Sequence, residues 1–173
     1  MSVYPRLVAG VVLAVAVGCS ARANTAGTPT SQAVPEGPAP SVGRAVHADD
    51  VAGTGVFPLR KGFMVAIPEE AAPRLRPLTG RNVADEGGLR HASFTLIETD
   101  LIALGGTAAT IGEVGGFSLD VATGRYLLCL SNSFPDHEAS APYRIVGCAF
   151  GRITPGCAPV VTFGEGGVQV TGL

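Results

Sequence analysis

The chain has 173 residues, of which 46% are apolar and 15% charged, and its formal net charge is −2. This apolar content is enough for one core, while the 24 glycines and 13 prolines interrupt the sequence too often for a helical domain. With Lys61 as the only lysine, the chain lacks the basic patch of nucleic-acid-binding proteins, so no nucleic-acid partner is expected. The composition therefore favours a single all-β domain.

Residues 1–18 have the pattern of an export signal. Arg6 and the α-amino group supply positive charge before an unbroken apolar run over residues 7–17. A helix that spans a bilayer needs about 20 apolar residues, so this run is too short to be a permanent membrane span and suits a signal peptide.

The apolar run ends in Ala16-Val17-Gly18-Cys19, which resembles the lipobox of bacterial lipoproteins. The resemblance implies cleavage before Cys19, attachment of fatty acyl chains to that residue, and anchoring to the extracytoplasmic face of the cell membrane. The alternative is an ordinary secreted protein, cut at a site such as Ala21-Arg22-Ala23 and left without an anchor.

Residues 19–50 are expected to be a disordered tether behind the lipidated cysteine. Residues 20–50 contain no aromatic residue, leucine, isoleucine or methionine, and prolines recur among alanine, serine, threonine and glycine. Such a composition cannot bury enough apolar surface to build a core. As a flexible coil this segment spans roughly 30 Å and would hold a head clear of the membrane.

Residues 51–173 are expected to form the folded head. Residues 55–59 and 62–67 are predicted to be two strands of a hairpin, joined near Arg60 and Lys61. Residues 69–78 are interpreted as a loop, because Pro73 and Pro77 restrict any helix to about one turn. Strands are then predicted over residues 91–98 and 101–104.

The clearest pattern lies in residues 105–130, which are predicted to be a meander of strands separated by glycine turns. Phe117, Leu119 and Val121 alternate with Ser118 and Asp120, which places the apolar side chains on one face of a strand. Beyond the polar residues 131–141, strands are predicted over residues 142–150 and 158–170, the second broken at residues 164–167. Short strands at this spacing favour a sandwich or barrel.

Three segments of the head resemble a known family. They are His91-Ala-Ser-Phe-Thr-Leu-Ile-Glu, Thr107-Ala-Ala-Thr and Gly116-Phe-Ser-Leu-Asp-Val-Ala-Thr-Gly-Arg-Tyr126. They are similar to the carboxypeptidase regulatory-like, or transthyretin-like, domains, which run from a Gly-x-Phe strand to a Pro-Gly-x-Tyr strand. The resemblance covers roughly residues 78–170. It implies an antiparallel β-sandwich of about seven strands, in a family whose role is usually binding, spacing or stabilising.

The head contains three cysteines in a compartment that is expected to be oxidising. If the strands on either side of residues 131–141 are antiparallel neighbours, Cys129 faces Cys148 at a distance that allows a disulfide. The simplest prediction is this bridge with Cys157 left over. The other two pairings, and three buried thiols without a bridge, remain open.

Motifs for catalysis or metal binding are weak. Asp136-His137-Glu138 is a compact group of metal-ligand types, and a solvated loop tip explains it more simply. No nucleophile elbow occurs, and Glu98 with Asp100 is expected to be a solvated strand edge. The glycines of residues 164–167 are expected to form a bulge or strand bend, since no helix or basic residue follows them.

The sequence therefore predicts a cell-surface lipoprotein whose head is not an enzyme and uses no cofactor. The head is expected to bind or scaffold an extracytoplasmic protein or a cell-wall partner. A small-ligand or metal carrier is the alternative, and a hydrolase ranks third.

Overall fold

The computed structural model describes residues 41–49, 55–80, 86–133, 142–154 and 159–171. The strands are β1 (Ser41–Asp49), β2 (Gly55–Pro58), β3 (Phe63–Pro68), β4 (Phe94–Leu96), β5 (Thr107–Thr110), β6 (Gly116–Leu119), β7 (Gly124–Ser131), β8 (Tyr143–Ile153), β9 (Val160–Gly164) and β10 (Gly167–Thr171). The helices are the 3-10 helix η1 (Glu69–Leu75) and the α-helices α1 (Arg76–Thr79), α2 (Glu86–Arg90) and α3 (Glu98–Ala103). The all-β prediction is therefore confirmed in its main point, since strands predominate and the helices are short.

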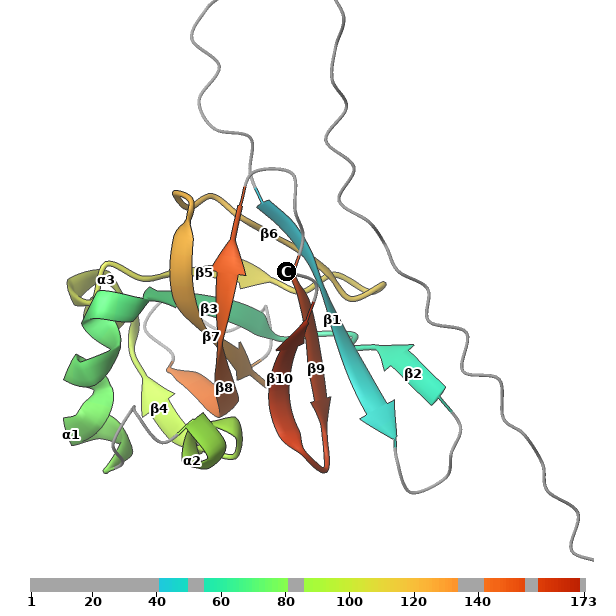
Figure 1. Cartoon of the computed structure of the whole chain (residues 1–173), viewed down its shortest axis with the longest axis horizontal. Helices are drawn as coiled ribbons and strands as arrows, with labels where there is room; N and C mark the ends of the chain where they lie inside the picture. The colour runs from blue at the N-terminus through green and yellow to red at the C-terminus, as the bar shows by residue number, and fades with distance from the viewer. Residues whose placement is uncertain (1–40, 50–54, 81–85, 134–141, 155–158, 172–173) are drawn as a thin grey trace, which may run out of the picture.

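The strands form two sheets (Figure 1). Sheet A has the order β10-β9-β1-β2, and β6 pairs with β1 beside β2. Sheet B has the order β4-β8-β7-β3-β5. Among the ten described strands all pairings are antiparallel except that of β1 with β9, which is parallel, so the expectation of a purely antiparallel sandwich of about seven strands is wrong in both respects.

Strand β1 is the central strand of sheet A. Its first half pairs with β6 and its second half with β2 along one edge, while β9 occupies the other edge. Ala45 and Val46 are buried in its middle. The predicted boundary between tether and head at residue 50 is therefore too late by a whole strand. Composition failed there because a strand flanked on both edges needs few large side chains of its own.

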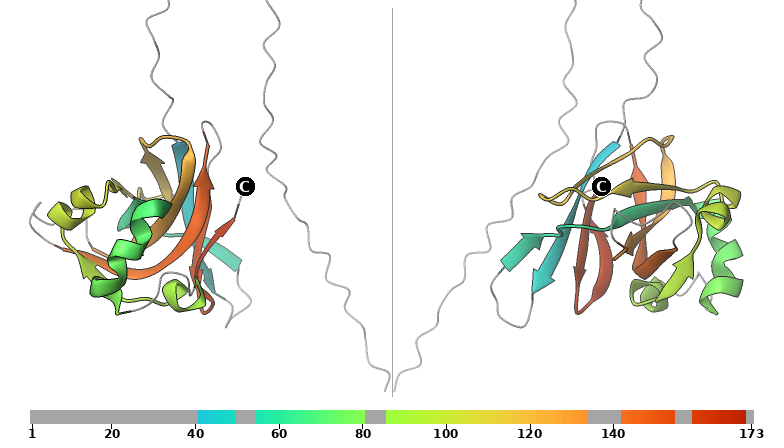
Figure 2. Two further views of the ribbon diagram at one scale, coloured as in Figure 1. Left: turned by 60° about the vertical axis from the view of Figure 1, so that its left-hand side comes forward. Right: turned by 180° about the vertical axis from the view of Figure 1, so that it is seen from behind.

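Sheet B is buried on both faces. In β3, Phe63, Val65 and Ile67 belong to a core shared with the helices, while Met64 and Ala66 belong to a second core shared with sheet A. Strand β7 divides its side chains between the two cores in the same way. The molecule thus has three layers, and Figure 2 shows the helices on one side and β1 with β2 on the other.

The helical layer differs from the sequence prediction in two places. Residues 69–79 form η1 and α1 where a loop was expected, because Pro73 fits a 3-10 turn and Pro77 stands in the first turn of α1, where no backbone N–H is required. Residues 98–103 form α3 where a strand was expected. Leu101 and Leu104 are both buried, a helical spacing that a short apolar run conceals.

The chain alternates between the sheets where local hairpins were predicted. The strands β2 and β3 exist, but they do not pair with each other, and the chain crosses from sheet A to sheet B at Lys61 and Gly62, both of which have positive φ. The meander prediction is also wrong, because β5 and β7 belong to sheet B whereas β6, between them in the sequence, pairs with β1 of sheet A. At Gly115, a Cβ atom would lie 2.3 Å from the carbonyl oxygen of Ala45, so close approach to β1 requires glycine there.

Two residues of the strongest sequence motif have clear structural roles. Phe117 lies opposite Gly43 in the β1–β6 pairing, and its ring occupies the space that a side chain at that position would fill. The hydroxyl of Tyr126 donates a hydrogen bond of 2.9 Å to the carbonyl of Ala122, four residues earlier. This bond resembles the tyrosine corner of Greek-key sandwiches, which fixes the entry of the chain into a strand.

Candidate functional site

The cysteine pair lies inside sheet B. Cys129 and Cys148 are directly opposite each other in the β7–β8 ladder and form a disulfide, as predicted. Both are fully buried in the core beneath the helices. The disulfide therefore fixes β8 to β7 at the point where β8 leaves the cover of β4.

Strand β8 is paired on its outer edge at one end only. β4 covers residues 143–145, and among the described residues no strand pairs with the outer edge of residues 148–152. In sheet A, β9 is the one strand that pairs with β10 within the described ranges. We call the place where β8 and β10 meet the seam, defined by residues 147–152 of β8 and residues 168–171 of β10.

Glycines let the two sheets approach closely at the seam. A Cβ atom at Gly147 would lie 2.7 Å from Val168, and one at Gly151 would lie 2.7 Å from Val170. The carbonyl oxygen of Arg90, at the end of α2, would lie 2.3 Å from the same atom at Gly147. The glycines of β8 thus allow β10 and the end of α2 to pack directly on the backbone of β8.

A groove of about 130 Å³ runs along the seam. Its lining consists of two residues at the end of α2, three of β8 and three of β10, namely Leu89, Arg90, Cys148, Ala149, Phe150, Gln169, Val170 and Thr171. The polar groups at this groove are a guanidinium, an amide, a hydroxyl and the main chain of two open strand edges. Such groups bind and orient a ligand through hydrogen bonds and charge.

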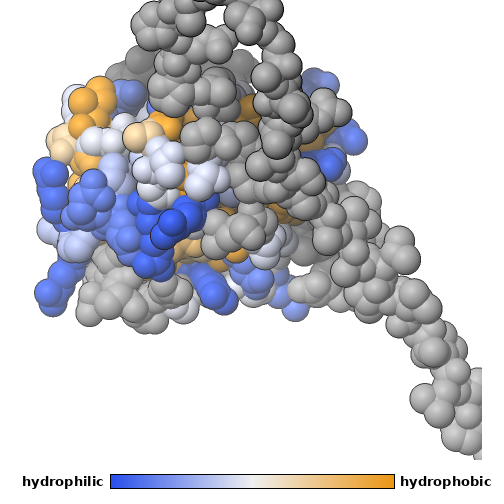
Figure 3. Space-filling model, turned by 45° about the horizontal axis from the view of Figure 1, so that its top comes forward, coloured by the Kyte–Doolittle hydropathy of each residue, from blue (hydrophilic) through white to orange (hydrophobic). Residues whose placement is uncertain are grey.

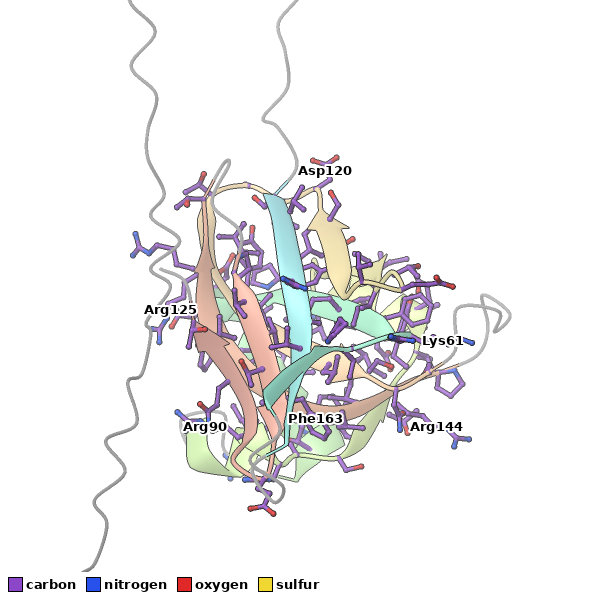
Figure 4. The ribbon with its side chains drawn as sticks, turned by 90° about the vertical axis from the view of Figure 1, so that its right-hand side faces the viewer. Lys61, Arg90, Asp120, Arg125, Arg144 and Phe163 are labelled. Carbon is purple, nitrogen blue, oxygen red and sulfur yellow. A yellow bond between two sulfur atoms is a disulfide. The ribbon has the colours of Figure 1, made fainter. Side chains whose placement is uncertain are left out.

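Arg90 lines this groove, and two further arginines lie on neighbouring parts of β7 and β8. Arg125 and Arg152 are directly opposite each other in the β7–β8 ladder, an arrangement of like charges that destabilises a sheet. The Arg125 guanidinium forms an ion pair with Glu69, with 2.6 Å between its nitrogen and a carboxylate oxygen. The same guanidinium lies 5.0 Å from the centre of the Phe150 ring. Arg90 and Arg152 are exposed and form no ion pair with any described residue. Figure 4 shows Arg90 and Arg125 on one side of the molecule and Arg144 on the other.

A second groove, of about 210 Å³, lies between α1 and α3. Leu78, Ala103 and Leu104 line it together with Arg74, Pro77 and Asp100. Leu78 is 42% exposed, and Ile97 and Ile102 beside it on the helical layer are 43% and 64% exposed. Figure 3 shows hydrophobic residues gathered at the end of the molecule where Figure 1 places α3.

A buried tyrosine closes the covered end of β8. The Tyr143 hydroxyl donates a hydrogen bond of 2.5 Å to the carboxylate of Glu98, and its ring contacts Phe63 edge to face at 5.3 Å. Burial and this bond raise the pKa of Tyr143 to about 12. Glu98 therefore stabilises the join of α3 and β8, and it does not form the solvated strand edge with Asp100 that the sequence predicted.

Several residues singled out in the sequence lie outside the described ranges. Cys19, Cys157 and the Asp136-His137-Glu138 group are among them, so the lipidation and metal predictions stay predictions. Within the described ranges, no group of three or more metal-ligand side chains gathers, and no helix is long and apolar enough to cross a membrane. The glycines of residues 164–167 form the turn between β9 and β10.

The seam is the part of the site that sequence reasoning missed. The sequence feature that marks it is the pair of glycines four residues apart in β8, Gly147 and Gly151. Glycines normally weaken a strand, and their role in close packing becomes clear only from the valines of β10 that face them. Comparison of the chain with protein-family models, with curated proteins and with solved structures gave no match.

Proposed function

We propose that the chain is a bacterial cell-surface lipoprotein whose β-rich head binds an extracytoplasmic partner at the seam without catalysing a reaction. Cys19 is the lipidated residue and residues 19–40 are the tether in this proposal. As a flexible coil, such a tether would span roughly 25 Å. The head would then reach a protein or cell-wall component near the membrane.

The observation that carries the binding role is the pair of open strand edges at the seam. Open edges expose unpaired main-chain N–H and C=O groups, and folded proteins usually cover or charge them. In this head β4 and the helices cover the rest of β8, while none of the described strands pairs with the edge of residues 148–152. A partner that supplies a strand would complete it.

The chemistry at the groove favours binding over catalysis. Cys148 is held in a disulfide and therefore offers no thiolate nucleophile. The volumes of the two grooves, about 130 and 210 Å³, are smaller than the roughly 300 Å³ at which ligand pockets begin. The described part of the head therefore supports a macromolecular partner better than a small-ligand carrier.

We also retain the transthyretin-like relationship as part of the proposal. The stacking of Phe117 on Gly43 and the hydrogen bond from Tyr126 to Ala122 give structural reasons for the Gly-x-Phe and Gly-x-Tyr motifs. The helical layer and the parallel pairing of β1 with β9 would then be additions to that sandwich.

The anchor is tested by expressing the full chain in a bacterial host with a labelled fatty acid. We expect the label on the protein and the protein in the membrane fraction. Both should be lost when Cys19→Ala removes the acceptor thiol, or when the lipoprotein signal peptidase is inhibited. Membrane association that persists in Cys19→Ala would contradict lipidation at this residue.

The binding role is tested with a photo-crosslinking side chain placed at Gln169, in the seam, and at Asp120 as a matched control. Figure 4 places Asp120 at the opposite end of the molecule from Arg90. We expect a discrete crosslinked product in intact cells from position 169 only. Products of equal pattern from both positions, or none from position 169, would contradict a partner at the seam.

A further inference from the structure

We propose that the seam takes an extended peptide segment in which acidic and small apolar residues alternate, and that this segment adds a strand to the outer edge of β8. The inference rests on the proposed binding function and names the chemistry of its partner. Three features of the seam define the segment: its open edges, its arginines and its apolar floor.

The open edges require an extended main chain. The uncovered stretch of β8 is residues 148–152, which is about the length of an average strand. The disulfide holds this stretch in register with β7, and α2 closes the groove at Arg90. A rigid open edge of this kind binds peptides by strand addition, in which main-chain hydrogen bonds supply the affinity.

The arginines select acidic side chains on one face of the added strand. Phe150 and Arg152 lie on the helical face of β8, and Arg125 lies on the same face of β7, directly opposite Arg152. Successive residues of an added strand point to opposite faces, so every second side chain would lie on the face of β8 that carries Arg152. A carboxylate there would pair with Arg152, which has no ion pair among the described residues, whereas Arg125 is already paired with Glu69.

The intervening side chains of the added strand would face the space between the sheets. On that face β8 presents Ala149 and Gly151, and β10 presents Val170. Because these residues leave little room, small apolar side chains such as valine or alanine fit this position. The segment therefore alternates acidic and small apolar residues over about five positions.

Other occupants of the edge fit less well. Residues 20–40 of the chain itself contain Pro29, Pro35, Pro38 and Pro40, which lack the N–H groups that a ladder requires. A second copy, paired through its own β8, would place Arg125 and Arg152 of both copies on one face of a joined sheet. The like charges disfavour that arrangement.

The test is a titration of the full chain, purified in mild detergent, with fluorescent hexapeptides in which Asp-Val or Lys-Val is repeated three times. A third peptide carries Asp-Val repeats that are N-methylated at every residue, so that neither edge of the strand can donate main-chain hydrogen bonds. We expect the Asp-Val peptide to bind at least about tenfold more tightly than either of the others. Equal binding of the acidic and basic peptides would overturn the charge assignment, and equal binding of the methylated peptide would overturn strand addition.

Charge-reversed variants locate the site. Arg152→Glu should weaken the Asp-Val peptide by about tenfold or more and strengthen the Lys-Val peptide. Arg144→Glu, on the covered end of the same strand, should change neither affinity. Loss of affinity in Arg144→Glu, or none in Arg152→Glu, would place the peptide elsewhere and overturn the proposal.

The two proposals fail separately. If the Asp-Val peptide does not bind while the Gln169 position still crosslinks to a discrete partner in cells, the peptide class is wrong and the binding function stands. If neither is observed, both are wrong. If the chain elutes as a dimer and position 169 crosslinks to a second copy of the chain, a second copy occupies the edge and the peptide proposal is overturned.

Discussion

The two sheets of this head are stabilised in different ways. Sheet B is buried on both faces, carries the Cys129–Cys148 disulfide, and is overlaid by four short helices. The buried residues of sheet A belong to one core only within the described ranges; this sheet is assembled around a strand that begins at Ser41 and contains no disulfide among those residues. The open edge of β8 therefore belongs to sheet B, the sheet that is packed on both faces and cross-linked by the disulfide. The seam is an exposed strand edge on the better stabilised of the two sheets.

The difference also appears in the sequence patterns. Strands covered on both faces have continuous apolar runs, as in β3 and β7, whereas strands covered on one face alternate, as in β6. A continuous apolar run is therefore typical of a strand that lies between two layers. The helices that cover sheet B were difficult to predict because each is six residues or shorter, apart from the seven-residue η1.

Removal of β1 should have the largest effect, because it breaks sheet A at its centre. A chain that begins at Val51, the predicted start of the head, lacks the strand that pairs with β2, β6 and β9. We expect it to show no cooperative unfolding transition by circular dichroism. A chain that begins at residue 40 retains β1 and should unfold like the full chain, and equal stability of the two truncations would contradict the central place of β1.

Removal of the disulfide should be the next largest effect and tests the rigidity of sheet B. The bridge closes a loop with a sequence separation of 19 residues, so Cys129→Ala with Cys148→Ala should lower the free energy of unfolding by about 3 kcal/mol. Denaturant unfolding with and without a reductant measures it. A double variant as stable as the oxidised parent would show that the bridge does not stabilise the sheet.

A methyl group at the seam should separate the two sheets. Gly147→Ala places a Cβ atom 2.3 Å from the Arg90 carbonyl oxygen, and we expect a loss of about 2 kcal/mol from this overpacking. Gly116→Ala is the matched control, because no atom lies within 4 Å of its Cβ position, and its effect should stay within about 0.5 kcal/mol. Equal losses in thermal or denaturant unfolding would contradict the close packing of β8 with β10 and α2.

The join between sheet B and the helical layer has a pH signature. The folded-state pKa of Tyr143, about 12, exceeds its ordinary value of 10.0, so the folded chain holds this proton more tightly than the unfolded chain does. This contribution to stability is complete below pH 10 and is lost as the pH rises to 12. Tyr143→Phe should cost about 1.5 kcal/mol near pH 7 and flatten the decline between pH 10 and 12. An equally steep decline in the variant would contradict the assignment to Tyr143.

The smallest effect distinguishes function from stability at the seam. Arg152→Ala removes the like-charge pair with Arg125 and should raise the free energy of unfolding by up to about 0.5 kcal/mol at low salt, while weakening the Asp-Val peptide. Arg144→Ala should do neither. A destabilised Arg152→Ala would mean that the arginine supports the fold, and its conflict with Arg125 would then be no sign of a binding site.

The sequence was most informative where the physical signal is local. Cys129 and Cys148 lie in the strands on either side of residues 131–141, and this placement predicted the disulfide. The alternation around Phe117 predicted β6. The glycine turns of residues 112–116 were also found, although their main role at Gly115 is contact with β1.

Pairing between distant segments could not be predicted. No local pattern tells that β6 pairs with β1 or that β9 runs parallel to it, because such partners are selected by packing across the whole head. The seam depends on these long-range pairings, since it exists only where β10 and β8 meet, at contacts such as that of Gly147 with Val168, which are 21 residues apart in the sequence. For this reason the candidate site was absent from the sequence prediction.

Hydrogen exchange of the full chain, alone and with the Asp-Val hexapeptide, is the most direct test of the seam as a binding site. In the free chain, amides of residues 148–152 and 168–171 should exchange faster than those of β7, which is paired on both edges. The peptide should slow exchange in these two stretches and leave α1 and α3 unchanged. Protection that appears instead around the groove between α1 and α3, or no change at β8, would contradict the assignment.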